Sequence, residues 1–236
     1  MTTTAERPEP AQPASQPSAP APRRIPGPAG RAAARCISRL QRRYRQDNPA
    51  AVAEVARLRR GAGRTAHALQ DHWGLGGLDE LAEILADGRT PVRREHAEEA
   101  VYLAVTLWAL HQQSVRDRDM HDPEETLGRA VRGLMRAKNT GTSRADEELN
   151  EPVRKRLVRV GTAASIESVA VRLREIVLLL RDVRLPLDYG RLADQLYRWQ
   201  SLPERAAVRR EWGREFHLAG HSRKSADDEY DDESGE

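Results

Sequence analysis

Apolar residues recur every three or four positions along most of this 236-residue chain, which is the spacing of one face of an amphipathic α-helix. Val101, Val105 and Trp108 continue one such face, and Leu173 and Ile176 belong to another. No stretch alternates apolar and polar residues with the period of two that a half-buried strand requires. The pattern therefore predicts an all-α fold.

Proline and glycine mark where the predicted helices begin and end. Asn48-Pro49, Thr90-Pro91 and Asp122-Pro123 each place a capping side chain before a proline that fits the first turn of a helix. With the apolar spacing, these signals predict helices over residues 31–46, 49–60, 78–86, 91–114, 123–137, 151–160, 165–184, 188–200 and 203–218.

A polar segment, residues 138–150 (KNTGTSRADEELN), separates the predicted helices into two groups. We expect this segment to be a mobile loop, which is a common place for binding elements. The sequence thus predicts two small helical bundles, an N-terminal lobe of residues 30–137 and a C-terminal lobe of residues 151–219.

The two ends of the chain have the composition of disordered tails. Residues 1–29 hold eight of the 14 prolines, interleaved with Ala, Ser and Gln, and cannot bury enough apolar surface to offset the entropy of ordering. Residues 220–236 carry seven acidic residues against two basic ones. We therefore predict a proline-rich tail at one end and an acidic tail at the other.

The charge between the tails favours an anionic partner. The whole chain has a formal net charge of +3, but residues 31–219 carry seven more basic than acidic residues. All but three of the 39 basic residues are arginine. A body this basic attracts nucleic acid or another anionic surface, although charge says nothing about fold.

Other features argue against export and membrane insertion. Cys36 is the only cysteine, so the chain has no disulfide of its own, and the N-terminus lacks the order of a secretory signal. The longest apolar-leaning run, residues 101–110, is about half of the ~20 residues that a membrane-spanning helix needs. We expect a cytoplasmic protein without a membrane contact.

The sequence offers no catalytic or metal-binding constellation. His67 and His72 are five residues apart, so they do not share a helix face, and no further ligands converge on them. Gly61-Ala-Gly63 resembles part of a dinucleotide-binding turn but follows a predicted helix instead of a strand. No serine has a recognisable His–acid partner. We predict no catalytic residue, metal, cofactor or small-molecule substrate.

The basic residues concentrate in a few segments that could hold a sugar–phosphate backbone. Converging guanidinium groups are enough for phosphate contacts. The few aromatic residues lie within apolar-periodic segments, so we expect contacts to the backbone instead of stacking on bases. The candidate nucleic-acid-binding residues are Arg57, Arg60, Arg64, Arg132, Arg136, Lys138, Arg144, Arg154, Arg156 and Arg159.

The C-terminal third carries a more specific pattern. A basic helix start (PVRKRLVRV) precedes a Thr/Ala/Ser break, a long helix rich in Arg and Leu, the segment PLDYGRLADQLYRW and the final segment VRREWGREF. In this order the segments resemble the CasB family, the small subunit of the type I-E CRISPR surveillance complex called Cascade. The resemblance extends over residues 31–219 and leaves out both tails.

The resemblance implies an all-helical protein in two lobes without enzymatic activity. It further implies two copies along the belly of Cascade, in contact with the backbone subunit CasC, the large subunit CasA, crRNA and target DNA. There the family is thought to stabilise the R-loop and to guide the displaced strand over a basic surface. The resemblance maps its basic regions onto eight of the candidates, all except Lys138 and Arg144.

Two other interpretations fit the residues. A helical DNA-binding regulator would use the helix in residues 186–200 for recognition, although Tyr189 and Trp199 favour burial of that helix. A protein–protein adaptor would use its arginines only for solvation and would show no salt-dependent affinity for nucleic acid.

Overall fold

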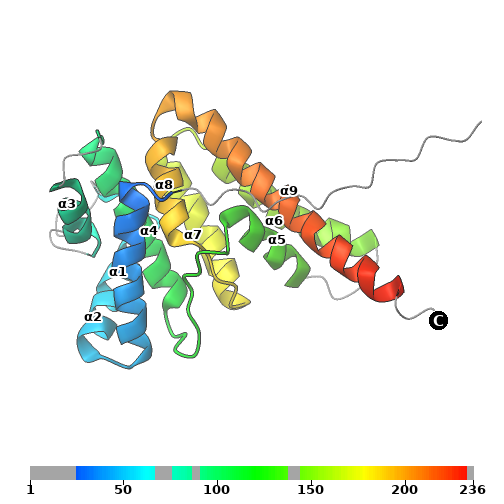
Figure 1. Cartoon of the computed structure of the whole chain (residues 1–236), viewed down its shortest axis with the longest axis horizontal. Helices are drawn as coiled ribbons and strands as arrows, with labels where there is room; N and C mark the ends of the chain where they lie inside the picture. The colour runs from blue at the N-terminus through cyan, green and yellow to red at the C-terminus, as the bar shows by residue number, and fades with distance from the viewer. Residues whose placement is uncertain (1–24, 67–75, 87–90, 138–143, 233–236) are drawn as a thin grey trace, which may run out of the picture.

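The computed structural model describes residues 25–66, 76–86, 91–137 and 144–232, with side chains from residue 151 to 219 in the last range. This part of the chain is all-helical, with no strand beyond a one-residue bridge between His121 and Leu187 (Figure 1). The elements are α1 (Pro28–Arg45), α2 (Pro49–Leu58), the 3₁₀ turn η1 (Arg59–Gly61), α3 (Leu78–Ala86), α4 (Arg94–Gln112), α5 (Leu127–Ala137), α6 (Arg144–Gly161), α7 (Ile166–Asp182), α8 (Tyr189–Trp199) and α9 (Leu202–Asp232). The predicted fold class is confirmed.

Of the capping signals in the sequence, Asn48-Pro49 forms as predicted. The side chain of Asn48 accepts a hydrogen bond from the amide of Ala51, and Pro49 occupies the first turn of α2. Asp188 caps α8 in the same way through the amide of Arg191. These caps satisfy amide groups that lack a partner within the helix and so fix where each helix begins.

The central element is α4, which is buried without a break from Glu99 to Gln112. It packs against α1, α7, α8 and the turn η1. A buried amide joins several elements of this core: Gln41 accepts hydrogen bonds from the indole of Trp108 at 3.1 Å and the amide of His121 at 3.0 Å. A helix buried on every side must be surrounded, which explains why the other helices wrap around it.

A second layer is formed by α5, α6, α7 and α9. Helix α5 lies along α9, and α6 packs against both α5 and α7 (Figure 1). Gly128 permits the close approach of α5, because a β-carbon there would lie 2.4 Å from the backbone nitrogen of Phe216. Helix α8 connects the layers, since it packs on α1 and α4 and also on α9. The division into two lobes at residues 138–150 stays a prediction.

Several helix ends differ from the prediction. Helix α4 begins at Arg94 and α5 at Leu127, so Pro91 and Pro123 precede these helices instead of lying in their first turns. The differences are larger in α6 and α9. Helix α6 begins at Arg144, so Pro152 lies inside it instead of in its first turn, and part of the predicted loop is helical. The eight residues before the proline, RADEELNE, include three Glu and one each of Arg, Ala and Leu, which favour helix enough to offset one missing backbone hydrogen bond. The backbone of α9 likewise stays helical to Asp232, past Ala219 where the tail was expected. The proline-rich tail up to residue 24, residues 138–143 and residues 233–236 lie outside the described part.

In the described part of the chain, no helix combines the length and the apolar character needed to cross a bilayer.

Candidate nucleic-acid interface

The first predicted group of arginines lies where α2 passes into η1. Arg57, Arg60 and Arg64 are exposed, and within the described ranges none of them forms an ion pair. Their guanidinium groups therefore keep their full hydrogen-bonding capacity for an anion. We call Arg57, Arg60 and Arg64 the η1 group.

The loop that carries the η1 group is fixed in place by its glycines. A β-carbon at Gly61 would lie 2.1 Å from the hydroxyl oxygen of Tyr102 on α4. Gly63 has a φ of +84°, and a β-carbon there would lie 2.6 Å from Cδ of Arg174 on α7. The amide of Ala66 donates to the buried Glu99 carboxylate, 3.1 Å from each oxygen. A rigid loop presents its arginines without a large cost in ordering them.

Arg174 is a basic residue that sequence analysis did not single out. It is exposed, has no ion pair with a described residue and lies against the loop at Gly63. Its place in the apolar pattern of α7 identifies an exposed helix edge, but only the packing of the loop on α7 shows that it lies beside the η1 group. The structure therefore extends that group onto a second element.

The second predicted group lies on α6, and its members differ in how far they are engaged. Arg154 pairs with Glu151 at 2.8 Å, and the half-buried Arg156 donates to the carbonyl oxygen of Pro152 at 3.3 Å. Arg159 is exposed and forms no ion pair within the described ranges, while its carbonyl oxygen accepts a hydrogen bond from Arg172 of α7. Of this group, Arg159 is the residue most available to a ligand.

The third predicted group lies where α5 runs along α9. The guanidinium carbon of Arg132 lies 5.3 Å from the centre of the Phe216 ring, and Arg136 donates a hydrogen bond to the carbonyl oxygen of Ala219. We call this surface, formed by Arg132 and Arg136 with residues 216–219, the α5–α9 edge. Both arginines stabilise helix packing as well as contributing positive charge.

The last two candidates cannot be placed as fully. Lys138 lies outside the described residues. Arg144 is the first residue of α6, and its side chain also lies outside the described part. The structure thus positions eight of the ten predicted residues, and it distributes them over three surfaces instead of one.

The outer face of α9 adds three arginines that are not among the predicted candidates. Arg209, Arg210 and Arg214 are exposed and have no ion pair with any described residue. Cγ of Arg209 would lie 3.5 Å from a β-carbon at Gly161, so the end of α6 and the face of α9 are neighbours.

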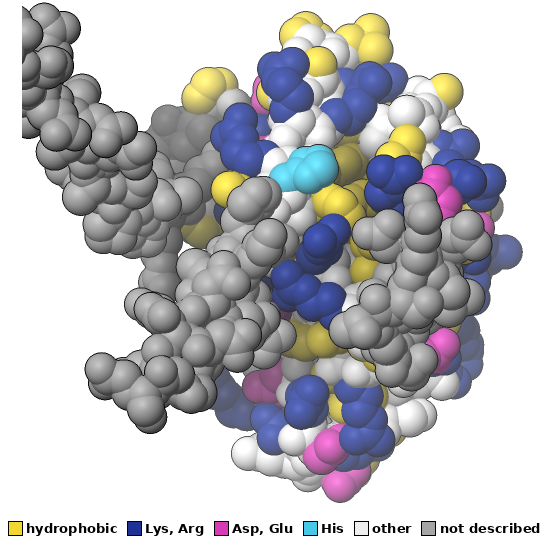
Figure 2. Space-filling model, turned by 90° about the vertical axis from the view of Figure 1, so that its right-hand side faces the viewer, with side chains coloured by type: hydrophobic (Ala, Val, Ile, Leu, Met, Phe, Trp, Pro, Cys, Tyr) yellow, Lys and Arg dark blue, Asp and Glu magenta, His cyan; other side chains and the backbone are white. Residues whose placement is uncertain are grey.

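Figure 2 shows the side of the molecule toward which α5, α6 and α9 extend in Figure 1. Lys and Arg side chains lie over most of the described surface on this side, and Asp and Glu side chains are fewer. Several arginines on other surfaces are neutralised, for example Arg45 by Asp119 at 2.9 Å and Arg184 by Asp117 at 3.0 Å. On α6 itself paired and unpaired cations are neighbours, since Arg154 and Lys155 pair with Glu151 while Arg159 forms no ion pair with a described residue.

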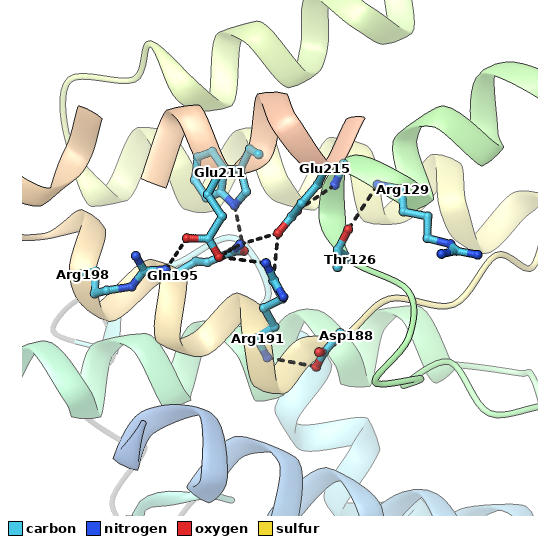
Figure 3. Close-up of polar contacts among 10 residues, drawn as sticks. Thr126, Arg129, Asp188, Arg191, Gln195, Arg198, Glu211 and Glu215 are labelled. Atoms are coloured by element: carbon cyan, nitrogen blue, oxygen red, sulfur yellow. Dashed lines mark hydrogen bonds and ion pairs between the residues drawn. The ribbon is translucent and has the colours of Figure 1, made fainter. Parts of the chain in front are cut away.

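A buried polar cluster fixes α9 relative to α8 (Figure 3). Gln195 is its centre: its amide nitrogen donates to Glu211 at 3.1 Å and to Glu215 at 3.0 Å, and its oxygen accepts from the indole of Trp212 at 2.7 Å. Arg198 pairs with Glu211 at 2.6 Å. The contacts link two helices through several charge-assisted hydrogen bonds, which specify one arrangement. We call this set of residues the α8–α9 cluster.

The two carboxyl groups of the α8–α9 cluster differ in acidity. Burial raises the pKa of Glu215 above its ordinary value, although the nearby positive charge of Arg191 opposes the shift. Burial acts in the same direction on Glu211, but the hydrogen bonds from Arg198 and Gln195 outweigh it and lower the pKa of that carboxyl. Both groups are held by protein partners, and this arrangement is a structural clamp.

The helix considered as a DNA-recognition element is buried. Tyr189, Leu192, Leu196 and Trp199 of α8 all lie in the core, and the helix packs on α1 and α4. A recognition helix must expose the side chains that enter the major groove. Within the described residues, no group of His, Cys, Asp and Glu side chains is arranged to hold a metal ion.

Comparison with known proteins identifies relatives. The model of the family described as CRISPR-associated protein Cse2 matches residues 54–217. The crystal structure of CasB from Thermobifida fusca is similar at 41% sequence identity, with a TM-score of 0.66, covering 82% of this chain and 99% of that one. A chain of a CRISPR RNA-guided surveillance complex shares the fold at 21% identity and a TM-score of 0.58, covering 84% of this chain and 98% of the other. A search of curated proteins gave no match.

Proposed function

Because this chain belongs to the CRISPR-associated Cse2 (CasB) family, we propose that it is the non-catalytic small subunit of a Cascade surveillance complex in antiviral defence. Its partners in this role are the backbone subunit CasC, the large subunit CasA, a second copy of the chain, crRNA and target DNA. The family match carries the proposal. A relative found as a chain of a CRISPR RNA-guided surveillance complex supports it through the shared fold.

We further propose that the small subunit stabilises the R-loop through contacts between arginines and the sugar–phosphate backbone. The exposed η1 group, Arg174 and Arg159 support this step, because they have no carboxylate partner within the described ranges. Packing of η1 on α4, and of the loop at Gly63 on α7, already holds the segments that carry the η1 group and Arg174. Backbone contacts are independent of base sequence, as a subunit that serves many guides requires.

The energetics of R-loop formation make a modest contribution sufficient. Replacing a DNA duplex by an RNA–DNA hybrid is a near-balanced exchange. A few phosphate contacts to the displaced strand therefore shift the balance toward the open state. Neutralising a phosphate also releases counterions, so the contribution must decrease as salt increases.

The test is the salt dependence of binding to a labelled single-stranded oligonucleotide, measured by fluorescence anisotropy. A triple variant, Arg60→Gln, Arg64→Gln and Arg159→Gln, removes three cations that lack a described carboxylate partner. If each contacts one phosphate, the slope of log K against log salt falls in magnitude by about 2, since each contact on a single strand contributes ~0.7. In the assembled complex, the same variant should shorten the R-loop lifetime.

A matched control separates local contacts from overall charge. The variant Arg35→Gln, Arg45→Gln and Arg184→Gln removes the same charge from three exposed arginines that are each paired with a carboxylate. We expect its salt slope to equal that of the unmodified protein. Equal slopes for both variants, or an R-loop lifetime that neither variant changes, would contradict the proposed contacts.

A further inference from the structure

Helix α5 carries two of the candidate arginines, and its place on α9 decides where they lie. Gly128, Arg132 and Arg136 are four residues apart, so they share one face of α5. A β-carbon at Gly128 would lie 2.4 Å from the backbone nitrogen of Phe216. Further along, Arg132 lies over the ring of that residue and Arg136 donates to the carbonyl oxygen of Ala219. The two helices therefore run side by side in the same direction, and a shift of α5 along α9 would move both guanidinium groups.

The N-terminus of α5 is held by a carboxylate from α9. The first turn of α5 contains no acidic residue, and Glu125, just before it, pairs with Arg129 at 3.3 Å. The amide of Gly128 instead donates to Oε2 of Glu215 at 3.3 Å, and the side chain of Thr126 forms a hydrogen bond with the same carboxylate (Figure 3). A negative group at this position satisfies an amide that lacks a partner within the helix and stabilises the positive end of the helix dipole.

The Glu215 carboxylate is also fixed from the side of α8. Its Oε1 lies 2.8 Å from Nε of Arg191 and accepts from the amide nitrogen of Gln195 at 3.0 Å. Only 8% of the Glu215 side chain is exposed, so the group itself is not available to a ligand. One oxygen thus faces α8 and the other faces α5. Glu211, the other carboxylate of the α8–α9 cluster, bonds to Gln195 and Arg198 of α8.

We propose that Glu215 is a positioning residue for nucleic-acid binding, because its carboxylate caps α5 and thereby holds Arg132 and Arg136 in register along the α5–α9 edge for contact with a strand. The inference rests on the proposed function and deepens it. The η1 group lies on rigid elements of its own, whereas the contribution of α5 depends on one buried side chain of another helix.

The sign of the charge makes the proposal decisive. Replacing Glu215 by a neutral residue removes a negative charge from a basic protein, and the change in charge alone predicts tighter binding of an anionic strand. Loss of the register of α5 predicts weaker binding and a smaller salt dependence. The two effects have opposite directions, so the direction that is measured distinguishes them.

The experiment measures binding of the full chain to a labelled single-stranded oligonucleotide by fluorescence anisotropy at several salt concentrations. If Arg132 and Arg136 each contact one phosphate, Glu215→Ala lowers the slope of log K against log salt by up to about 1.4 in magnitude. Between 50 and 200 mM salt, the unmodified protein should then lose about sevenfold more affinity than Glu215→Ala. Circular dichroism confirms that each variant is folded at the temperature of the titration.

Two matched variants separate the cap from other effects. Glu211→Ala removes the same charge from the same cluster but leaves the Gly128 amide its partner, so its slope should not fall; an equal fall would show that loosening of α8 against α9 is the cause. Glu215→Gln keeps an oxygen that can accept from the Gly128 amide and loses the charge beside Arg191. It should bind like the unmodified protein, and a slope as small as that of Glu215→Ala would overturn the cap in favour of the ion pair.

A double-mutant cycle locates the effect on α5. With Arg132→Gln and Arg136→Gln already present, Glu215→Ala should lower the slope no further, and an additional fall overturns the assignment to these arginines. Where Glu215→Ala does not fold, Glu215→Asp, which withdraws the carboxylate by one methylene, replaces it with the same expected direction. Unchanged or tighter binding by the Glu215 variant shows that the apolar packing of α5 alone sets its position and overturns the proposal.

Failure of the positioning role is distinct from failure of the proposed function. If Arg132→Gln with Arg136→Gln changes nothing while the triple variant of Arg60, Arg64 and Arg159 lowers the slope, the proposed function stands and the positioning role of Glu215 is wrong. Absence of salt-dependent binding by the unmodified protein contradicts both.

Discussion

The N-terminus of helix α1 is capped by a side chain from another helix, and removal of this cap is the most quantitative test of the fold. Gly27 is the capping residue and has no side chain to offer. The carboxylate of Asp194 on α8 replaces it, accepting hydrogen bonds from the amide of Gly27 at 2.6 Å and from the amide of Gly30 at 2.7 Å. One side chain thus caps a helix that lies more than 160 residues away in the sequence and joins two helices of the core.

The expected cost follows from the number and kind of these bonds. Asp194→Asn keeps one acceptor oxygen, loses the charge at the positive end of the α1 dipole and turns an amide donor toward a backbone donor. Losing one charge-assisted hydrogen bond costs about 1.5–3 kcal/mol, and a lost cap typically costs ~1 kcal/mol. We therefore expect a loss of about 2–3 kcal/mol of unfolding free energy, or about 4–12 °C in Tm for a chain of this size.

The assay is urea unfolding followed by circular dichroism, with Asp182→Asn as the matched control. Asp182 is exposed at the end of α7 and has no hydrogen bond or ion pair with a described residue. Removing its charge from a helix C-terminus should leave stability unchanged or raise it slightly. A loss of less than about 0.5 kcal/mol for Asp194→Asn would refute the claim that this carboxylate acts as the cap of α1.

Three further predictions use buried groups. Gly128→Ala should destabilise the protein by about 2–4 kcal/mol in the same assay, because the new β-carbon would overlap the α9 backbone. Gly213→Ala, whose β-carbon would have no neighbour within 4 Å, should instead raise the unfolding free energy by about 0.5–1 kcal/mol. Equal effects of the two substitutions would contradict the close α5–α9 contact. Burial lowers the pKa of His111 to about 3, so as the pH falls the unfolded chain takes up a proton near pH 6.5 while the folded chain does not. The unfolding free energy should therefore fall between pH 6.5 and 3, and His111→Gln should flatten this dependence of stability on pH. Burial raises the pKa of Cys36 to about 12, so a thiol reagent should label it only after denaturation; rapid labelling of the native protein at pH 8 would show that α1 opens.

The local parts of the fold could be predicted because short-range signals determine them. The spacing of apolar residues predicted α7 over residues 165–184, and the structure has it from Ile166 to Asp182. The start of α6 could not be predicted, because proline is compatible with the first turn of a helix and, at a cost, with its interior. Whether the helix starts at the proline or continues through it depends on the helix propensity of the preceding residues. The spacing of apolar residues does not measure that propensity.

The site could be predicted only as a set of exposed cations. Sequence indicates that Arg60 and Arg132 lie on basic segments, and it cannot distinguish an unpaired guanidinium from one that packs on Phe216. That distinction depends on contacts between helices that are distant in the chain. The same is true of Arg174, which lies beside the η1 group only because Gly63 lets the loop pack against α7.

Helix α8 holds the separate basic surfaces at a fixed separation, which bears on the proposed contact with one strand. Its Asp194 holds the start of α1, and its Gln195 and Arg198 hold α9 through Glu211. The two layers therefore cannot tilt relative to each other without breaking hydrogen bonds that involve buried charges, which is expensive. The η1 group on one layer and the arginines of α9 on the other consequently keep a fixed separation. A strand that contacts both meets a rigid array, so most of the electrostatic attraction contributes to binding and little is lost in ordering the protein.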